Sequence, residues 1–186
     1  VVSVGGAGGA LQISNRTAFL AGIANIRSAL GGNLHGLDWD QEIASPFNDA
    51  DVVWISQQLK ATYGAGFGIT FATTVVNGTP YTLNAAVACS RVGALDFYGQ
   101  QFYDAPVSLS AAVQRINEAI GRGIPQSQLG VGMMVGNSAN YWTNAQCRAN
   151  YAAIRQQFPG IQKAYLWEAS RAGTAEWCAD MRRING

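Results

Sequence analysis

The sequence predicts an α/β fold built around a parallel sheet. Apolar, strand-like segments alternate with segments of helical spacing along all 186 residues, and this alternation repeats six times. No linker, low-complexity run or change of composition interrupts it. Successive β/α units form a parallel sheet covered by helices, so we expect a single domain over residues 1–186.

The individual elements follow from apolar runs and from residues that begin or end helices. Glycines end the first strand, Asn48 or Asp49 is a suitable N-cap, and Pro159-Gly160 stops the fifth helix. The helix over 108–121 opens on Ser-Leu-Ser and closes on glycine. The expected strands are 1–9, 34–42, 67–74, 94–103, 129–136 and 161–168, and the expected helices are 15–30, 49–63, 83–92, 108–121, 144–158 and 175–184.

Two architectures contain such units, a doubly wound open sheet and a TIM-type (β/α)8 barrel. The barrel typically needs about 250 residues and eight units. Two further units preceding Val1 would account for the shorter length and for the start on an apolar strand without a Met. We therefore expect the barrel, with its strands three to eight in this chain.

The composition excludes several kinds of partner. Hydrophobic residues make up 48% of the chain and charged residues 12%, and the net charge is +1 without a Lys/Arg cluster. These values argue against nucleic acid or an anionic membrane as a partner. The cysteines Cys89, Cys147 and Cys178 lack metal-binding spacing. They are either all reduced or include a Cys147–Cys178 disulfide.

The most informative stretch is LHGLDWDQE, residues 34–42, with Asp38, Asp40 and Glu42 spaced two apart. Residues two apart on a strand share a face, so the acids line one side while Leu37 and Trp39 face the covering helices. Crowded carboxylates cannot all ionise easily, and we expect at least one raised pKa, as a general acid needs.

The pattern of this acidic strand is compatible with three further roles. It could be a solvated hairpin, although Leu37 and Trp39 between the acids argue against that. It could bind Ca²⁺ or Mg²⁺, although Ile43 stands where an EF-hand loop requires glycine. Asp38 could also be a purely structural, hydrogen-bonded acid.

Four segments resemble motifs of glycoside hydrolase family 18, the chitinases and endo-β-N-acetylglucosaminidases. GLDWDQE is similar to the DGxDxDxE motif of that family's fourth strand. SVGG at 3–6, LDFYGQQFYD at 95–104 and YLWE at 165–168 resemble its third-, sixth- and eighth-strand motifs. Their order and spacing fit the family along the whole chain.

The resemblance implies a role for each acid. Glu42 corresponds to the general acid and base, Asp40 to the acid that orients the substrate's acetamido group, and Asp38 to an inner acid sharing a proton with Asp40. The family uses substrate assistance, in which the acetamido oxygen attacks the anomeric carbon. No second carboxylate is then needed as a nucleophile.

The resemblance also implies binding residues near other strand ends. Tyr103 corresponds to the tyrosine that hydrogen-bonds the acetamido oxygen, with Gln101 and Asp104 beside it, and Trp167 to the floor of the sugar subsite. Without the resemblance, Tyr103 and Trp167 would be interpreted as ordinary core. Three further aromatic residues could stack on sugars or simply pack, namely Tyr98, Tyr141 and Trp142.

The sequence departs from the family motif at His35, which replaces its first Asp. We expect a buried, hydrogen-bonded histidine there, with an influence on the pH optimum. The segment between Gly136 and Ile161 is too short for an extra domain, and Gln101 stands where many relatives have Met. Both features favour the open-groove, endo-acting branch.

The expected activity is retaining, endo-acting cleavage of β-1,4 bonds in chitin or N-acetylglucosamine oligomers, without metal or cofactor. An endo-β-N-acetylglucosaminidase acting on N-glycans and a chitin-binding lectin are the alternatives. The presence of Glu42 favours an enzyme over a lectin. The resemblance also implies secretion, and we expect a monomer.

Overall fold

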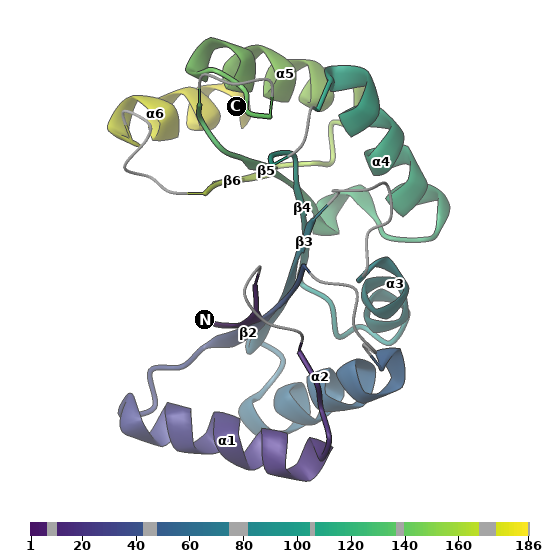
Figure 1. Ribbon diagram of the computed structural model, residues 1–186, viewed down its shortest axis with the longest axis vertical. Helices are drawn as coiled ribbons and strands as arrows, with labels where there is room; N and C mark the ends of the chain where they lie inside the picture. The colour runs from purple at the N-terminus through teal and green to yellow at the C-terminus, as the bar shows by residue number, and fades with distance from the viewer. Residues whose placement is uncertain are drawn as a thin grey trace. The chain divides into compact units, whose positions relative to one another are not determined.

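The computed structural model describes residues 1–6, 11–42, 48–74, 82–104, 107–136, 140–167 and 174–185. Strands and helices alternate along these residues (Figure 1). The strands are β1 (Val2–Gly5), β2 (Gly36–Gln41), β3 (Gly68–Thr74), β4 (Phe97–Gln101), β5 (Leu129–Met133) and β6 (Lys163–Leu166). The helices are α1 (Arg16–Ala29), α2 (Asp49–Tyr63), α3 (Leu83–Arg91), α4 (Leu109–Gly121), α5 (Asn144–Gln157) and α6 (Thr174–Asn185), and a short 3₁₀-helix, Gln126–Gln128, precedes β5.

The strands form one sheet in the order β1-β2-β3-β4-β5-β6, and β1–β2, β2–β3 and β5–β6 are parallel pairs. A doubly wound sheet reverses its strand order at a switch point, whereas neighbours in a (β/α)8 barrel follow the chain order. The sequential order therefore confirms the barrel-type fold over the doubly wound alternative.

The chain divides into two compact units. The first comprises Val1–Thr73 and Tyr81–Tyr98, and the second comprises Thr74–Pro80 and Gly99–Gly186. Strand β4 begins in the first unit and ends in the second. The single catalytic domain expected from the sequence stays a prediction.

In the first unit, α1, α2 and α3 lie on one face of the strands (Figure 1). Trp39 of β2 is fully buried on that face. Its ring stacks on Phe19 of α1 with centroids 5.5 Å apart, and its Nε1 donates to Ser56 Oγ of α2 at 3.1 Å. Asn48 caps α2 by accepting from the Ala50 amide at 3.0 Å, as the sequence predicts.

Strand β4 starts three residues later than the sequence suggests. The Asp96 amide donates to the Ile69 carbonyl at 2.9 Å, and its carboxylate accepts from the Ile69 amide and from Lys60 Nζ, both at 2.7 Å. The turn before β4 is therefore fixed to β3 and α2. An apolar pattern alone does not reveal these side-chain bonds.

In the second unit, a tyrosine of β6 lies across two neighbouring strands. A Cβ added to Gly132 of β5 would lie 2.3 Å from both Cζ and Oη of Tyr165. The Tyr165 hydroxyl donates to the Gly99 carbonyl of β4 at 3.4 Å. The tyrosine ring therefore occupies the space that a side chain at residue 132 would need.

All three cysteines are free thiols in the structure, so the reduced alternative holds and the Cys147–Cys178 disulfide is not formed. Burial raises the pKa of Cys89 to about 11, against a smaller opposing effect of the Ser56 hydrogen bond. Burial likewise raises the pKa of Cys147 to about 11. Among the helices of the described ranges, none is long and apolar enough to cross a membrane.

Candidate active site

The two faces of β2 separate acids from apolar side chains, as the alternation predicts. Leu37 and Trp39 are fully buried on the helix side, together with Gln41. Asp38 and Asp40 point to the opposite face and are half-buried. Glu42 directly follows the strand and is also half-buried. The first unit thus presents a column of three carboxylates at the C-terminal part of β2.

Asp38 is held by hydroxyl groups from both neighbouring strands. Ser3 of β1 and Thr70 of β3 stand in register with Asp38. Ser3 Oγ donates to Asp38 Oδ2 at 2.9 Å, and Thr70 Oγ1 donates to Asp38 Oδ1 at 2.5 Å. Each oxygen of the Asp38 carboxylate therefore has its own hydrogen-bond donor. The two bonds set the orientation of this first acid along β2.

The row around Asp40 contains only small neighbours. Gly5 of β1 and Ala72 of β3 are its register partners. Gly5 has φ +115°, and a Cβ there would lie 2.0 Å from the Asp40 carbonyl oxygen, so only glycine fits. The Gly6 amide also donates to that carbonyl at 2.6 Å. Neither register partner therefore carries a side chain larger than a methyl group.

Sequence reasoning missed Thr70 as a member of this site. The signal was present in FGITFATT, where Thr70 and Ala72 alternate with the buried Ile69 and Phe71. A polar residue on the non-helix face of a strand beside the acids was the available clue. Its partner, however, depends on strand register, which the sequence does not state.

The second unit carries the predicted binding residues at the end of β4. Gln101 and Tyr103 are buried, with exposed fractions of 4% each. Asp104 is exposed and has φ +61°, a left-handed conformation that is uncommon outside glycine. Tyr141 Oη donates to Asp104 Oδ1 at 2.8 Å. Gln101, Tyr103 and Asp104 therefore lie at one strand end and Tyr141 contacts the last of them, while their roles in binding stay predictions.

Trp167 lies just beyond β6 and is 56% exposed. Its backbone amide donates to the Met133 carbonyl of β5 at 2.8 Å, which fixes the start of the segment after the strand. An exposed indole at a strand end suits the stacking of a sugar ring better than core packing. Tyr98 and Trp142, by contrast, are buried and serve packing.

The structure groups the predicted residues by unit. Asp38, Asp40 and Glu42 share the end of β2 in the first unit, whereas Gln101, Tyr103, Asp104 and Trp167 belong to the second. The last residue of the YLWE motif, Glu168, lies outside the described residues. Within the ranges that the structure covers, no three His, Cys, Asp or Glu side chains form a group suited to a metal ion.

The prediction of a buried His35 is wrong. His35 is exposed, and its backbone carbonyl accepts from the Gly68 amide at 2.8 Å. His35 lies just before Gly36, where β2 begins. At Gly36 the backbones of β2 and β3 are too close together for a side chain to fit between them. A Cβ on Gly36 would be 2.7 Å from the Gly68 carbonyl oxygen. His35 and Glu42 therefore stand at opposite ends of the strand.

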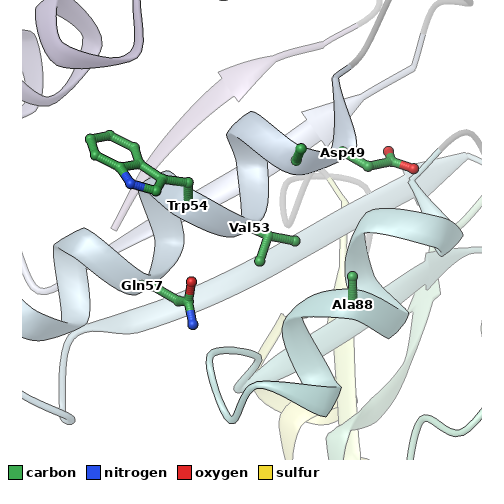
Figure 2. A pocket seen from close by; sticks show the side chains of 6 residues that line it. Asp49, Val53, Trp54, Gln57 and Ala88 are labelled. Carbon is green, nitrogen blue, oxygen red and sulfur yellow. The ribbon is translucent and has the colours of Figure 1, made fainter.

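A separate cavity of about 350 Å³ lies between α2 and α3 on the helix side of the first unit. Figure 2 shows Trp54, Val53 and Gln57 of α2 along it, with Ala88 of α3 opposite. Arg16 packs over the Trp54 ring at 4.4 Å. None of the predicted catalytic residues lines this cavity, so the acid column remains the candidate active site.

Comparisons with known proteins support the same fold. No protein-family model matches the sequence, and no curated protein does. A fungal endo-β-N-acetylglucosaminidase of glycosyl hydrolase family 18 matches 98% of this chain and 69% of its own, with 20% identity and a TM-score of 0.72.

Two chitinase structures of the same family give similar values. The catalytic domain of a chitinase from the fern Peteris ryukyuensis matches 98% of this chain and 71% of its own, at 16% identity and a TM-score of 0.72. A chitinase from Pseudoalteromonas aurantia matches 99% of this chain and 75% of its own, at 15% identity and a TM-score of 0.73. The chain therefore has the fold of the family 18 glycoside hydrolases, consecutive β/α units of a TIM-type barrel.

Proposed function

We propose that this protein is a retaining, endo-acting glycoside hydrolase of family 18 that cleaves β-1,4 bonds next to N-acetylglucosamine. The observation that carries the proposal is the carboxylate column of β2. It combines a fixed inner acid, Asp38, an acid whose register partners are only glycine and alanine, Asp40, and an acid at the strand end, Glu42. The shared fold of chitinases and an endo-β-N-acetylglucosaminidase supports it.

In the proposed mechanism, Glu42 protonates the glycosidic oxygen while the substrate's own acetamido oxygen attacks the anomeric carbon. The C–O bond to the leaving sugar breaks as the new C–O bond forms. Glu42, now a carboxylate, then takes a proton from the water that opens the cyclic intermediate. Two displacements at one carbon give net retention.

The neighbouring residues prepare the acetamido group for that attack. Asp40 accepts a hydrogen bond from the acetamido N–H, and its register partners Gly5 and Ala72 have no polar side chain that would compete for its carboxylate. Tyr103 donates to the acetamido oxygen, Gln101 and Asp104 bind sugar hydroxyls, and Trp167 stacks beneath the ring. Holding the nucleophile close supplies much of the rate increase.

Chitin oligomers are the first-choice substrate. A structurally similar chitinase from Pyrococcus furiosus was solved with chito-oligosaccharides, at 14% identity and a TM-score of 0.68. The segment between β5 and β6 contains α5 and is too short for an extra domain, which supports an open groove and internal cleavage. Secretion and a monomeric state belong to the same proposal.

A second candidate is endo-β-N-acetylglucosaminidase activity on N-glycans. It is favoured by the similarity to the fungal enzyme of that type. Both activities cut next to an N-acetylglucosamine with the same catalytic groups. They differ in which sugars occupy the outer subsites.

The test is incubation with a chitin tetramer and, separately, with a high-mannose glycopeptide, followed by mass spectrometry. Glu42→Gln keeps the shape of the side chain but not its acidity, and should lower the cleavage rate by at least about 100-fold. Glu118→Gln on α4 changes a carboxylate far along the chain from the column and should leave cleavage unchanged.

Each result has a distinct meaning. If the parent and Glu118→Gln cleave the tetramer mainly to dimer and Glu42→Gln does not, the result supports the chitinase. Release of the glycan with an intact tetramer selects the second candidate. Binding of the tetramer without cleavage by any variant would sink the hydrolase and leave a lectin.

A further inference from the structure

We infer that Tyr141 is a positioning residue for sugar binding, acting through Asp104. This inference rests on the proposed function, in which Asp104 binds a sugar hydroxyl. Tyr141 precedes α5 and Asp104 follows β4, and the two are 37 residues apart in sequence. Only the fold of the second unit brings them together.

The contact between them is direct and charge-assisted. Tyr141 Oη donates to Asp104 Oδ1 at 2.8 Å, an optimal distance for a hydroxyl donor. A carboxylate accepts several hydrogen bonds through two oxygens. Oδ1 is therefore used to fix the group, and Oδ2 can accept from a sugar.

Asp104 needs such a restraint because of its backbone and its exposure. It is the one non-glycine residue with positive φ among those that the structure describes. Such conformations persist only where the surroundings hold them, and they concentrate at functional sites. An exposed aspartate would otherwise sample several rotamers, and each would place the acceptor oxygen differently.

Tyr141 is in turn fixed by packing against Gly136. A Cβ on Gly136 would lie 2.8–2.9 Å from three atoms of Tyr141, Cδ2, Cβ and Cγ. Gly136 does not have a positive φ, so glycine is needed there because a side chain would not fit and not because of the backbone conformation. The tyrosine therefore occupies a place that only a residue without a side chain leaves open.

The next residue, Trp142, fastens the same segment to both sides of Asp104. Its ring stacks near Phe102 with centroids 6.1 Å apart, and its Nε1 donates to the Val107 carbonyl at 2.9 Å. Its carbonyl accepts from the Gly136 amide at 3.2 Å. The contacts of Trp142 with Phe102 and Val107 therefore fix the segment that carries Tyr141 to the chain before and after Asp104.

The experiment compares four variants with the parent on the chitin tetramer: Tyr141→Phe, Asp104→Gly, which removes the carboxylate and suits the positive φ, the two combined, and Gly136→Ala. Removing the hydroxyl should raise KM by about tenfold, the usual effect of losing a hydrogen bond to a charged group. It should leave kcat within about twofold, because the acids of β2 are untouched. Gly136→Ala should raise KM in the same direction.

The combined variant separates positioning from independent binding. If Tyr141 acts only through Asp104, adding Tyr141→Phe to Asp104→Gly should raise KM no further, because the acceptor of the tyrosine hydroxyl is already gone. Tyr151→Phe is the matched control. It also removes a tyrosine hydroxyl of the second unit, which bonds Asn185 Oδ1 at 2.7 Å, and it should lower the melting temperature without changing KM.

Calorimetric binding of the tetramer in the Glu42→Gln background provides a readout that does not need catalysis. If the parent cleaves or binds the tetramer and Tyr141→Phe has the same KM and the same affinity, the inference is overturned while the proposed function stands. An additive rise of KM in the combined variant does the same. A parent that neither cleaves nor binds overturns the proposed function and the inference with it.

Discussion

Asp38 and its two hydroxyl donors show how single residues shape the acid column. Ser3 and Thr70 come from different strands and reach opposite oxygens of one carboxylate. A carboxylate held in this way cannot rotate toward Asp40 or away from it.

Thr70→Val tests the importance of this restraint. Valine keeps the shape of threonine and removes the 2.5 Å hydrogen bond, so Asp38 should reorient and kcat should fall by roughly tenfold. Steady-state kinetics on the chitin tetramer measure the change. An unaltered kcat would show that Ser3 alone suffices.

Thr73→Val is the matched control on the same strand. Thr73 faces the helix side, is fully buried, and its hydroxyl has no hydrogen-bond partner among the described residues. Valine removes that unsatisfied group, so the free energy of unfolding should stay equal or rise by up to about 1 kcal/mol, with kcat unchanged. Urea unfolding and the same kinetic assay give both values.

At the scale of elements, α3 and α5 each carry one fully buried cysteine. Burial raises the pKa of Cys89 and Cys147 to about 11, so both remain thiols at neutral pH. The unfolded chain loses these protons near pH 9.0. The stability gained from burying neutral thiols is therefore complete below that pH and is lost as pH rises toward about 11.

Thiol labelling should follow the same order. At about pH 8, iodoacetamide should modify the half-buried Cys178 first, while Cys89 and Cys147 react only near their raised pKa values or in urea. Mass spectrometry of tryptic peptides identifies the sites. Cys178→Ser should abolish native labelling at about pH 8, and rapid labelling of Cys89 would contradict the buried position.

The N-terminus of α5 allows an independent test of how a helix cap contributes to stability. Thr143 Oγ1 accepts from the Gln146 amide at 3.3 Å, and Gln146 Oε1 accepts from the Thr143 amide at 2.9 Å, which is a complete capping box. Thr143→Ala should lower the free energy of unfolding by about 1 kcal/mol. Thr143→Ser keeps the box and should restore most of it in urea unfolding.

The elements also show what a sequence can reveal. The bounds of α2 were predictable because Asn48 caps its start and Gly64 follows its end. The buried and acidic faces of β2 followed from alternation alone. The Thr70–Asp38 bond was not predictable because it depends on the register of two strands. The Tyr141–Asp104 bond was not predictable because it joins the segment before α5 to the segment after β4, 37 residues away. His35 was misjudged because its neighbours Leu34 and Gly36 are buried while its own side chain is exposed just before the strand begins.

The whole molecule has few charged side chains to keep it in solution. The chain carries +1 at pH 7, its isoelectric point is 7.9, and charged residues are 12% of the total. Since repulsion vanishes at the isoelectric point, solubility should be lowest near about pH 8, as measured by polyethylene glycol precipitation. Adding Gln114→Lys and Asn117→Lys on the exposed side of α4 should move the minimum upward, and an unmoved minimum would exclude net charge as the cause.

The tyrosine of β6 that lies over Gly132 has a consequence for how this sequence can vary. Neither position can change alone: a methyl group at 132 would collide with the ring, and a short side chain at 165 would leave a void above the glycine. A Cβ at 132 would also lie 2.8 Å from the backbone carbonyl oxygen of Gln100, so a shorter residue at 165 would not make room for a side chain there. Close relatives should therefore keep glycine at 132 and an aromatic residue at 165.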